Sequence, residues 1–218
     1  MPEHLTLEAV DVDGAIREAL DDKKTSSRLG FLQKAVVGGG TIAAGGVLLG
    51  GLPKLSLAAA SPAQDVEILN FALLLEYLEA EFYTQAVAGG ALSGETLAFA
   101  RVVGAHERAH VAFLRKALGS KANPKPTFDF KGTTENMAKF QATAVLLEDT
   151  GVSAYNGQGP RLTKKTLAAA ASIVSVEARH AAWIRDIVRK PPAPLAFDKA
   201  LTKQQVEAAV GRTGFIQA

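Results

Sequence analysis

The stretch "GAHERAH", residues 104–110, carries a glutamate and a histidine three positions apart. The stretch "VSVEARH", residues 174–180, repeats the pair at the same spacing within a long segment without proline. Residues three apart on an α-helix project side by side from one face. Each stretch therefore predicts a helix that presents a carboxylate beside an imidazole. The paired residues are Glu107 and His110 in the first stretch, and Glu177 and His180 in the second.

Four long helices are predicted around these two stretches. Ser61 is a typical N-cap, Pro62 suits the first helical position, and the apolar pattern that follows them stops at Gly89. Strand signals are nearly absent from the sequence. The predicted helices comprise residues 62–88, 94–118, 133–157 and 162–190.

The connections between these helices predict how they are arranged in space. Short turns join the first helix to the second and the third to the fourth, as expected for antiparallel neighbours. Between the second and third helices, "KANPKPTFDFKG", residues 121–132, contains two prolines and is expected to be extended. About fourteen extended residues reach on the order of 45 Å, which is the length of a bundle. The sequence therefore predicts an all-α four-helix bundle with one long crossover between helices two and three.

An acidic residue interrupts the apolar stripe of each predicted helix. Four carboxylates in one apolar core are untenable alone, because a buried unpaired charge is costly and like charges repel. Two divalent metal ions would balance four carboxylates, and two imidazoles would complete the ligand set. The predicted metal ligands are Glu76, Glu107, His110, Glu148, Glu177 and His180.

An internal repeat supports this choice of residues. Glu76 and Glu148 are 72 residues apart, and so are Tyr83 and Tyr155. The two Glu-x-x-His pairs are 70 residues apart. Each half of the predicted bundle therefore offers a glutamate, a tyrosine seven positions later, and then a Glu-x-x-His pair.

The repeat also separates Glu76 from the acids that follow it. Glu79 and Glu81 correspond to Gly151 and Ser153 in the second half, so Glu76 is the better candidate ligand. Glu79 lies on nearly the same helix face as Glu76. It is either an outer partner of the ligands or an ordinary salt-bridge partner.

The composition excludes several classes of site. The chain has 218 residues and no cysteine, so disulfides, thiolate zinc sites, iron–sulfur clusters and cysteine nucleophiles are excluded. Any metal must be held by oxygen and nitrogen ligands. The net charge is only +2, and the sequence has no cluster of basic residues and no group of aromatic residues on which bases could stack. Nucleic acid is therefore not an expected partner.

The amino-terminal region is predicted to direct export. Residues 35–52 are uncharged and contain seven glycines, and small residues suited to cleavage follow near position 60. The preceding "SSRLGFLQK" resembles a twin-arginine export signal, although Leu29 replaces its second arginine. The alternative is an uncleaved, membrane-associated helix. Both interpretations place the folded domain in the periplasm or cell envelope. We expect three parts: residues 1–60, a bundle over 61–191, and a tail with a short helix over 192–218.

With these features, residues from about 62 to 190 resemble the ferritin-like superfamily. "LNFALLLEYLEAEFY" and the predicted export are most similar to bacterial ferritin-like domain proteins related to desiccation-related proteins. The resemblance implies a di-iron or di-manganese centre without haem, because Met137 is the one methionine after the start. It also implies terminal ligands Glu76 and Glu148, bridging ligands Glu107 and Glu177, nitrogen ligands His110 and His180, and tyrosines Tyr83 and Tyr155 bonded to the bridging carboxylates.

Two functional classes remain open at this point. The first is an oxidoreductase that uses a metal pair with oxygen or peroxide in oxidative or desiccation stress. The second is a non-catalytic metal-binding or structural stress-protection protein; a membrane-tethered scaffold is a weaker third idea. The sequence also leaves open whether the metal is iron or manganese, and whether the protein is a monomer or a homodimer. His106 and His4 lie off the apolar stripes and receive no role, and Trp183 is expected to serve in packing rather than electron transfer.

Overall fold

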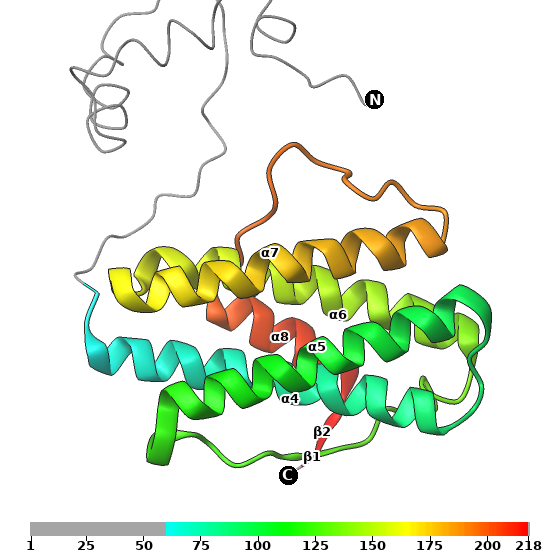
Figure 1. Cartoon of the computed structure of the whole chain (residues 1–218), viewed down its shortest axis with the longest axis horizontal. Helices are drawn as coiled ribbons and strands as arrows, with labels where there is room; N and C mark the ends of the chain where they lie inside the picture. Colours follow the sequence, from blue (N-terminus) through cyan, green and yellow to red (C-terminus); the bar gives the residue numbers. More distant parts are fainter. Residues whose placement is uncertain (1–59, 218) are drawn as a thin grey trace, which may run out of the picture. The chain divides into compact units, whose positions relative to one another are not determined.

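A computed structural model of the chain describes residues 60–217, which form a helical bundle (Figure 1). The observed architecture confirms the predicted all-α four-helix bundle with a long crossover. Helices α4 and α7 run in one direction, whereas α5 and α6 run in the other (Figure 1). The elements are α4 (Pro62–Ala88), α5 (Gly94–Leu118), α6 (Met137–Gln158), α7 (Lys164–Ile187), α8 (Lys203–Thr213), the 3₁₀ turns Gly119–Lys121 and Gly159–Arg161, and the strands β1 (Thr127–Phe128) and β2 (Ile216–Gln217).

The helix boundaries follow local capping chemistry. The Ser61 hydroxyl accepts a hydrogen bond of 3.2 Å from the Gln64 amide at the start of α4. Helix α6 begins at Met137 rather than at the predicted Thr133, because the Asn136 side chain caps it by accepting from the Lys139 amide at 3.0 Å. The residues just before this cap form turns instead. The predicted start of this helix is therefore one helical turn too early.

The crossover between α5 and α6 is fixed by the carboxy-terminal end of the chain. Strands β1 and β2 pair in antiparallel fashion, with Phe128 opposite Ile216. Behind this ladder, Phe215 packs edge-on against Phe130, and Phe130 packs against Phe82 of α4. The ring centroids are 5.3 Å apart in both pairs. The tail thus fastens the crossover to the outer side of the bundle.

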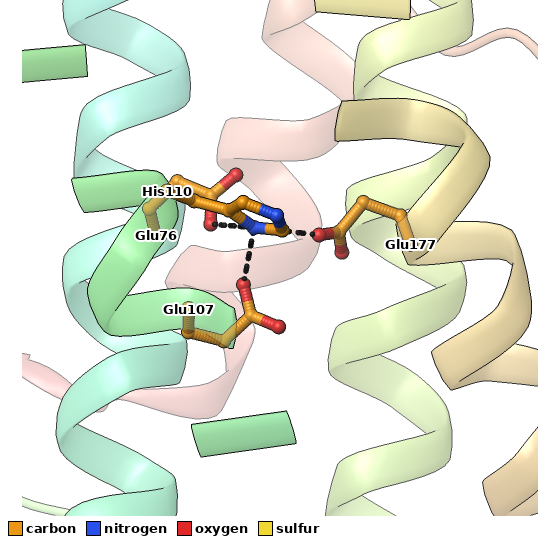
Figure 2. A group of neighbouring side chains, drawn as sticks. All are labelled: Glu76, Glu107, His110 and Glu177. Atoms are coloured by element: carbon orange, nitrogen blue, oxygen red, sulfur yellow. Dashed lines mark hydrogen bonds and ion pairs between the residues drawn. The ribbon is translucent and has the colours of Figure 1, made fainter. Parts of the chain in front are cut away.

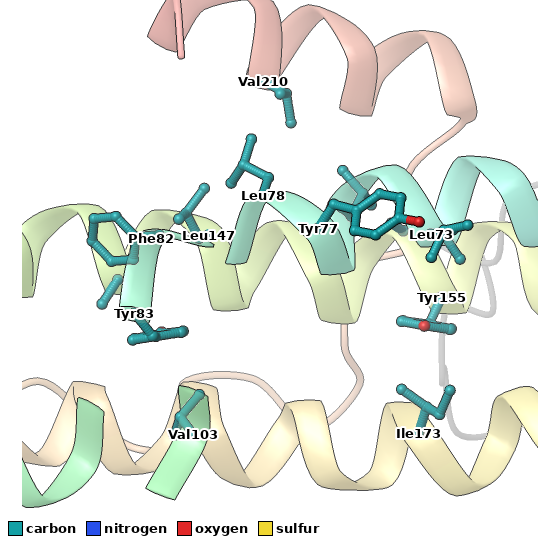
Figure 3. Close-up of a cluster of buried hydrophobic side chains, with 14 of the residues drawn as sticks. Leu73, Tyr77, Leu78, Phe82, Tyr83, Val103, Leu147, Tyr155, Ile173 and Val210 are labelled. Carbon is teal, nitrogen blue, oxygen red and sulfur yellow. The ribbon is translucent and has the colours of Figure 1, made fainter. Parts of the chain in front are cut away.

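The core lies between the two helix pairs α4–α5 and α6–α7. Its apolar residues come from all four helices, and α8 adds Val206 and Val210. Figure 3 shows Tyr83 and Tyr155 between the helix layers, toward opposite ends of this core. The contact between α5 and α7 is less extensive than the contact within either pair. The fold is therefore two helical hairpins docked face to face.

A glycine inside α6 allows the tail to approach closely. A Cβ atom at Gly157 would lie 1.8 Å from the carbonyl oxygen of Leu201. One turn earlier, the Ser153 carbonyl accepts a hydrogen bond of 3.0 Å from the Leu201 amide. The helix continues through Gly157 to Gln158, so this glycine serves the packing of the tail.

Replacing Gly157 by alanine is expected to lower the free energy of unfolding by about 1–3 kcal/mol, because the backbone at Leu201 must move away. Gly211 provides a matched control: it lies inside α8, and a Cβ there meets nothing within 4 Å. Gly211→Ala should raise stability by about 0.5–1 kcal/mol through helix propensity. Urea denaturation of both variants measures the difference. Equal stability changes would mean that the tail does not dock at α6.

Within residues 60–217, no helix is long and apolar enough to cross a membrane. The export-signal-like segment 35–52 and His4 lie outside the described residues. The predicted domain bounds and the predicted export stay predictions.

Candidate metal centre

All six predicted ligands lie together between the four bundle helices. The four glutamates are at most 1% exposed and His180 is 3% exposed, whereas the His110 side chain is 12% exposed. The helical pattern places them there, because each occupies the inward stripe of its own helix. Helix α4 contributes Glu76, α5 contributes Glu107 and His110, α6 contributes Glu148, and α7 contributes Glu177 and His180.

The first group of ligand atoms surrounds the imidazole of His110. Its Nδ1 lies 2.9 Å from Glu107 Oε2, 3.1 Å from Glu177 Oε1 and 3.2 Å from Glu76 Oε2. Figure 2 shows these carboxylates approaching the ring from α4, α5 and α7. One atom from each of the four residues lies within 4.8 Å of all the others, so the group could hold one metal ion.

The second group lies around His180. Its Nδ1 is 3.0 Å from Glu107 Oε1, 3.4 Å from Glu148 Oε2 and 3.9 Å from Glu177 Oε1. These four residues also meet the distance condition for holding one metal ion. Glu107 and Glu177 belong to both groups, while Glu76 and Glu148 belong to one group each. Glu107 and Glu177 could therefore contact two ions, and Glu76 and Glu148 one ion each; the bridging and terminal roles stay a prediction.

Poorly satisfied polar atoms mark this centre as a place for cations. In the described part of the chain, six buried side-chain polar atoms lack a well-aligned hydrogen bond, and five of them belong to the centre, although three of its oxygens lie 3.0–3.4 Å from a histidine nitrogen. Such atoms are uncommon in folded proteins, because a buried polar group without a good partner costs desolvation free energy. The four oxygens carry lone pairs, and His180 Nδ1 carries one once its ring loses a proton, so the five atoms suit a metal ion that prefers oxygen and nitrogen ligands. They are Glu107 Oε1, Glu148 Oε2, both carboxylate oxygens of Glu177, and His180 Nδ1.

Protons and imidazolium ions balance the carboxylates when metal is absent. Burial, with repulsion from neighbouring carboxylates, raises the pKa of Glu76 well above its usual range. Burial also raises the pKa of Glu148 to about 8, despite a hydrogen bond with His180. Burial acts in the same direction on Glu107, but hydrogen bonds from His110 and His180 outweigh it and lower the pKa to about 2. The centre therefore retains protons that metal ions would displace.

The two histidines carry the compensating charge. Burial alone would lower the pKa of each imidazole. Hydrogen bonds with Glu107, Glu177 and Glu76 instead raise the pKa of His110 to about 12. Hydrogen bonds with Glu107 and Glu148 raise the pKa of His180 to about 10. Both rings are therefore protonated at neutral pH in the metal-free protein.

The two tyrosines contact different carboxylates from those predicted. Tyr83 donates to Glu148, and Tyr155 donates to Glu76 at 2.5 Å. The expectation that they bond the bridging glutamates, Glu107 and Glu177, is wrong. Because α4 and α6 run in opposite directions, a tyrosine seven residues after its own glutamate lies beside the glutamate of the other helix (Figure 1). Burial raises the pKa of both phenols well above 10, so the hydroxyls stay protonated and donate.

Tyr155→Phe is expected to lower the free energy of unfolding of the metal-free protein by about 1–3 kcal/mol, because it leaves a buried oxygen of Glu76 without its donor. Tyr77→Phe is the matched control, since the Tyr77 hydroxyl makes only a long bond of 3.4 Å to the Asn123 carbonyl. Chemical denaturation in the presence of a chelator compares the two. A loss in Tyr77→Phe as large as that in Tyr155→Phe would contradict the role given to the Tyr155 bond.

A fifth buried carboxylate, Glu79, lies beside the six ligands. Burial and then repulsion from Glu148 raise its pKa well above the usual range. A Cβ atom at Gly151 would lie 3.5 Å from Glu79 Oε1 and 3.2 Å from Glu177 Oε2. Gly151 thus leaves the space that Glu79 occupies, and among the described residues no cation pairs with Glu79. The salt-bridge interpretation is therefore wrong, and Glu79 lies at the edge of the centre.

His106, which received no role from the sequence, lies against one of the six ligands. Its Nδ1 lies 2.8 Å from Nε2 of His180, and the two rings stack with centroids 5.1 Å apart. Burial, followed by the charge of His180, lowers the pKa of His106. The sequence feature that could have identified His106 is its position four residues before His110, because residues four apart are neighbours on one helix face. Trp183 donates to Glu95 at 3.1 Å and packs edge-on against Phe99, in agreement with a packing role.

Comparison with known proteins agrees with this geometry. A search of curated proteins finds no match to the chain. The family model described as "Ferritin-like domain" matches residues 64–190, which is more than half of the 218 residues and includes every residue of the two ligand groups. The chain therefore belongs to the ferritin-like domain family.

Proposed function

We propose that this protein binds two iron or manganese ions at the Glu/His centre and uses them in redox chemistry with oxygen or peroxide. The observation that supports this most directly is the pair of four-residue groups that share Glu107 and Glu177. The buried, poorly satisfied atoms of these groups give independent support, because they face one another at positions where a bound cation would pair with them.

Each residue would then have a defined task. Glu76 and His110 would hold one ion, Glu148 and His180 would hold the other, and Glu107 and Glu177 would lie between the two. A bound pair of such ions supplies electrons to a small oxidant. The hydroxyls of Tyr83 and Tyr155 orient the terminal carboxylates through their hydrogen bonds.

The surroundings favour a small reactant. All four glutamates are at most 1% exposed, and His110 is the most exposed of the six ligands at 12%. Oxygen and peroxide can reach such a centre through small fluctuations, whereas a large organic substrate requires an open cleft. Expulsion of bulk water also strengthens the interaction between the carboxylates and any bound cation.

Metal content of the purified protein tests the proposal first. Plasma mass spectrometry is expected to find about two iron or manganese ions per chain, as in other carboxylate-bridged bundles. The protein loaded with that metal should then consume peroxide or oxygen in repeated turnovers. Absence of metal, even after anaerobic reconstitution, would overturn both parts of the proposal.

A non-catalytic role is the second candidate, and the deep burial of the ligands favours it. A metal pair held by carboxylates that are fully enclosed suits sequestration or stabilisation of the fold as well as chemistry. A filled centre that consumes neither peroxide nor oxygen would decide for this second candidate.

We infer in addition that the protein acts outside the cytoplasm in oxidative or desiccation stress. The export-signal-like residues 35–52 and the resemblance to desiccation-related proteins support this inference. Intact mass measurement of the protein from cell-envelope fractions tests it. A chain that begins near residue 60 supports cleavage and export, a full-length chain in the membrane fraction supports tethering, and a cytoplasmic chain contradicts both.

A further inference from the structure

His110 and His180 differ in what contacts the ring nitrogen that faces away from the carboxylates. His180 directs Nδ1 toward Glu107 and Glu148, and its Nε2 lies 2.8 Å from Nδ1 of His106. The rings of His106 and His180 are inclined by only 22°. His106 thus lies behind His180, on the side away from the carboxylates, and its own side chain reaches the surface of α5.

This contact sets which nitrogen of His180 is free to bind metal. A ring that coordinates through Nδ1 must carry its proton on Nε2. His106 Nδ1 lies 2.8 Å from Nε2 of His180, where it can accept that proton in a hydrogen bond, and the stacking of the two rings limits rotation of His180. Hydrogen bonds of this kind fix the tautomer and orientation of a ligand and raise its basicity.

The other histidine lacks such a partner. The internal repeat relates His110 to His180 by 70 residues, and the same offset relates His106 to Val176. Valine has no hydrogen-bonding side chain. Among residues 60–217, no side-chain or backbone group hydrogen-bonds to Nε2 of His110, and its contacts with Glu76, Glu107 and Glu177 all use Nδ1. The pseudo-symmetry of the centre is therefore broken on its outer side.

We propose that His106 is a positioning residue for His180, so that the ion held by Glu148 and His180 binds more tightly than the ion held by Glu76 and His110. This inference rests on the proposed function, because it requires a two-metal centre. Loss of an outer partner of this type typically weakens metal binding by about 10–100-fold. The effect should be confined to one of the two ions.

Anaerobic titration of the metal-free protein with Mn²⁺, followed through the electron paramagnetic resonance of the free ion, measures both affinities. The wild-type chain should show two classes of binding. His106→Phe keeps a stacking ring but removes the acceptor, and it should weaken the tighter class by about 10–100-fold while the weaker class is unchanged. His106→Gln offers an amide oxygen as acceptor and should restore most of the loss. Arg101→Gln, an exposed change on the same helix, is the control.

A spectroscopic measurement separates positioning from a general loss of stability. In the Zn²⁺-loaded protein, the Nε2 proton of His180 should give a protected, downfield ¹⁵N-linked resonance, which His106→Phe abolishes and His106→Gln retains. Two ions bound with unchanged affinities in His106→Phe would overturn this inference alone. Absence of metal from the wild-type chain would overturn the proposed function and this inference together.

Discussion

Glu107→Gln should reduce the metal content from about two ions per chain to less than one, whereas Glu76→Gln should retain about one ion. The difference follows from the geometry, because Glu107 contributes to both ligand groups and Glu76 to only one. Glutamine has nearly the same volume as glutamate, so the packing of the core is preserved while the anionic ligand is lost. The same reasoning predicts that Glu177→Gln behaves like Glu107→Gln.

Each variant is dialysed against buffer that contains a trace of the metal, and its metal content per chain is then measured. Glu67→Gln is the matched control, since Glu67 is exposed on the same helix as Glu76 and lies outside both groups. It should bind as much metal as the wild-type chain. Equal metal contents in Glu107→Gln and Glu76→Gln would show that the two glutamates do not have the bridging and terminal roles assigned to them.

Removal of metal should lower the melting temperature by about 10 °C or more near pH 8, and by less near pH 5. A ligand at about 1,000 times its Kd stabilises a fold by roughly 4 kcal/mol, and each kcal/mol shifts the melting temperature of a domain of this size by about 2–4 °C. The second part of the prediction, its dependence on pH, follows from the pKa values of the metal-free centre.

The direction of that dependence comes from proton binding. Metal-free folded protein keeps the Glu148 proton up to a pKa of about 8, whereas an ordinary glutamate releases it at 4.5. The folded state therefore binds more protons than the unfolded state over this range, and stability falls as pH rises. His180 acts in the same direction, since its pKa rises from 6.5 to about 10. Glu107, with a pKa of about 2, reverses the trend only below pH 4.5.

Calorimetric melting temperatures of metal-loaded and chelated protein at pH 5, 6.5 and 8 test this prediction. The gap between the two forms should widen with each step, because the metal replaces protons that the chelated protein otherwise retains. A gap that is constant or that narrows toward pH 8 would contradict the proton displacement. Glu148→Gln should show a weaker pH dependence in its chelated form.

Much of the centre could be predicted because helical periodicity fixes which residues share a face. Glu107 and His110 are adjacent on any α-helix, and a glutamate in an apolar stripe must face the core of the bundle. The crossover followed from the length and proline content of residues 121–132. These inferences need only local geometry and the cost of burying charge.

What could not be predicted depends on contacts between helices. The partners of Tyr83 and Tyr155 depend on the relative level of two helices that run in opposite directions. His106 acquires its neighbour from α7, far along the chain. Gly157 looked like the end of a helix, because the close approach of Leu201 leaves no trace in local sequence. Local preferences do not determine such tertiary contacts.

The contacts at the centre also decide how the domain can assemble. Each helical hairpin brings three of the six ligands, and each leaves buried acids whose partners are on the other hairpin. We therefore expect neither hairpin to be stable alone, so that docking and the completion of both should occur as one cooperative step. A chain cut in the crossover should yield two fragments that fold only when they are mixed. Binding of metal would then show that the fragments have associated. The contacts that join the hairpins through the ligands include Tyr83–Glu148, Tyr155–Glu76, His110–Glu177 and His180–Glu107.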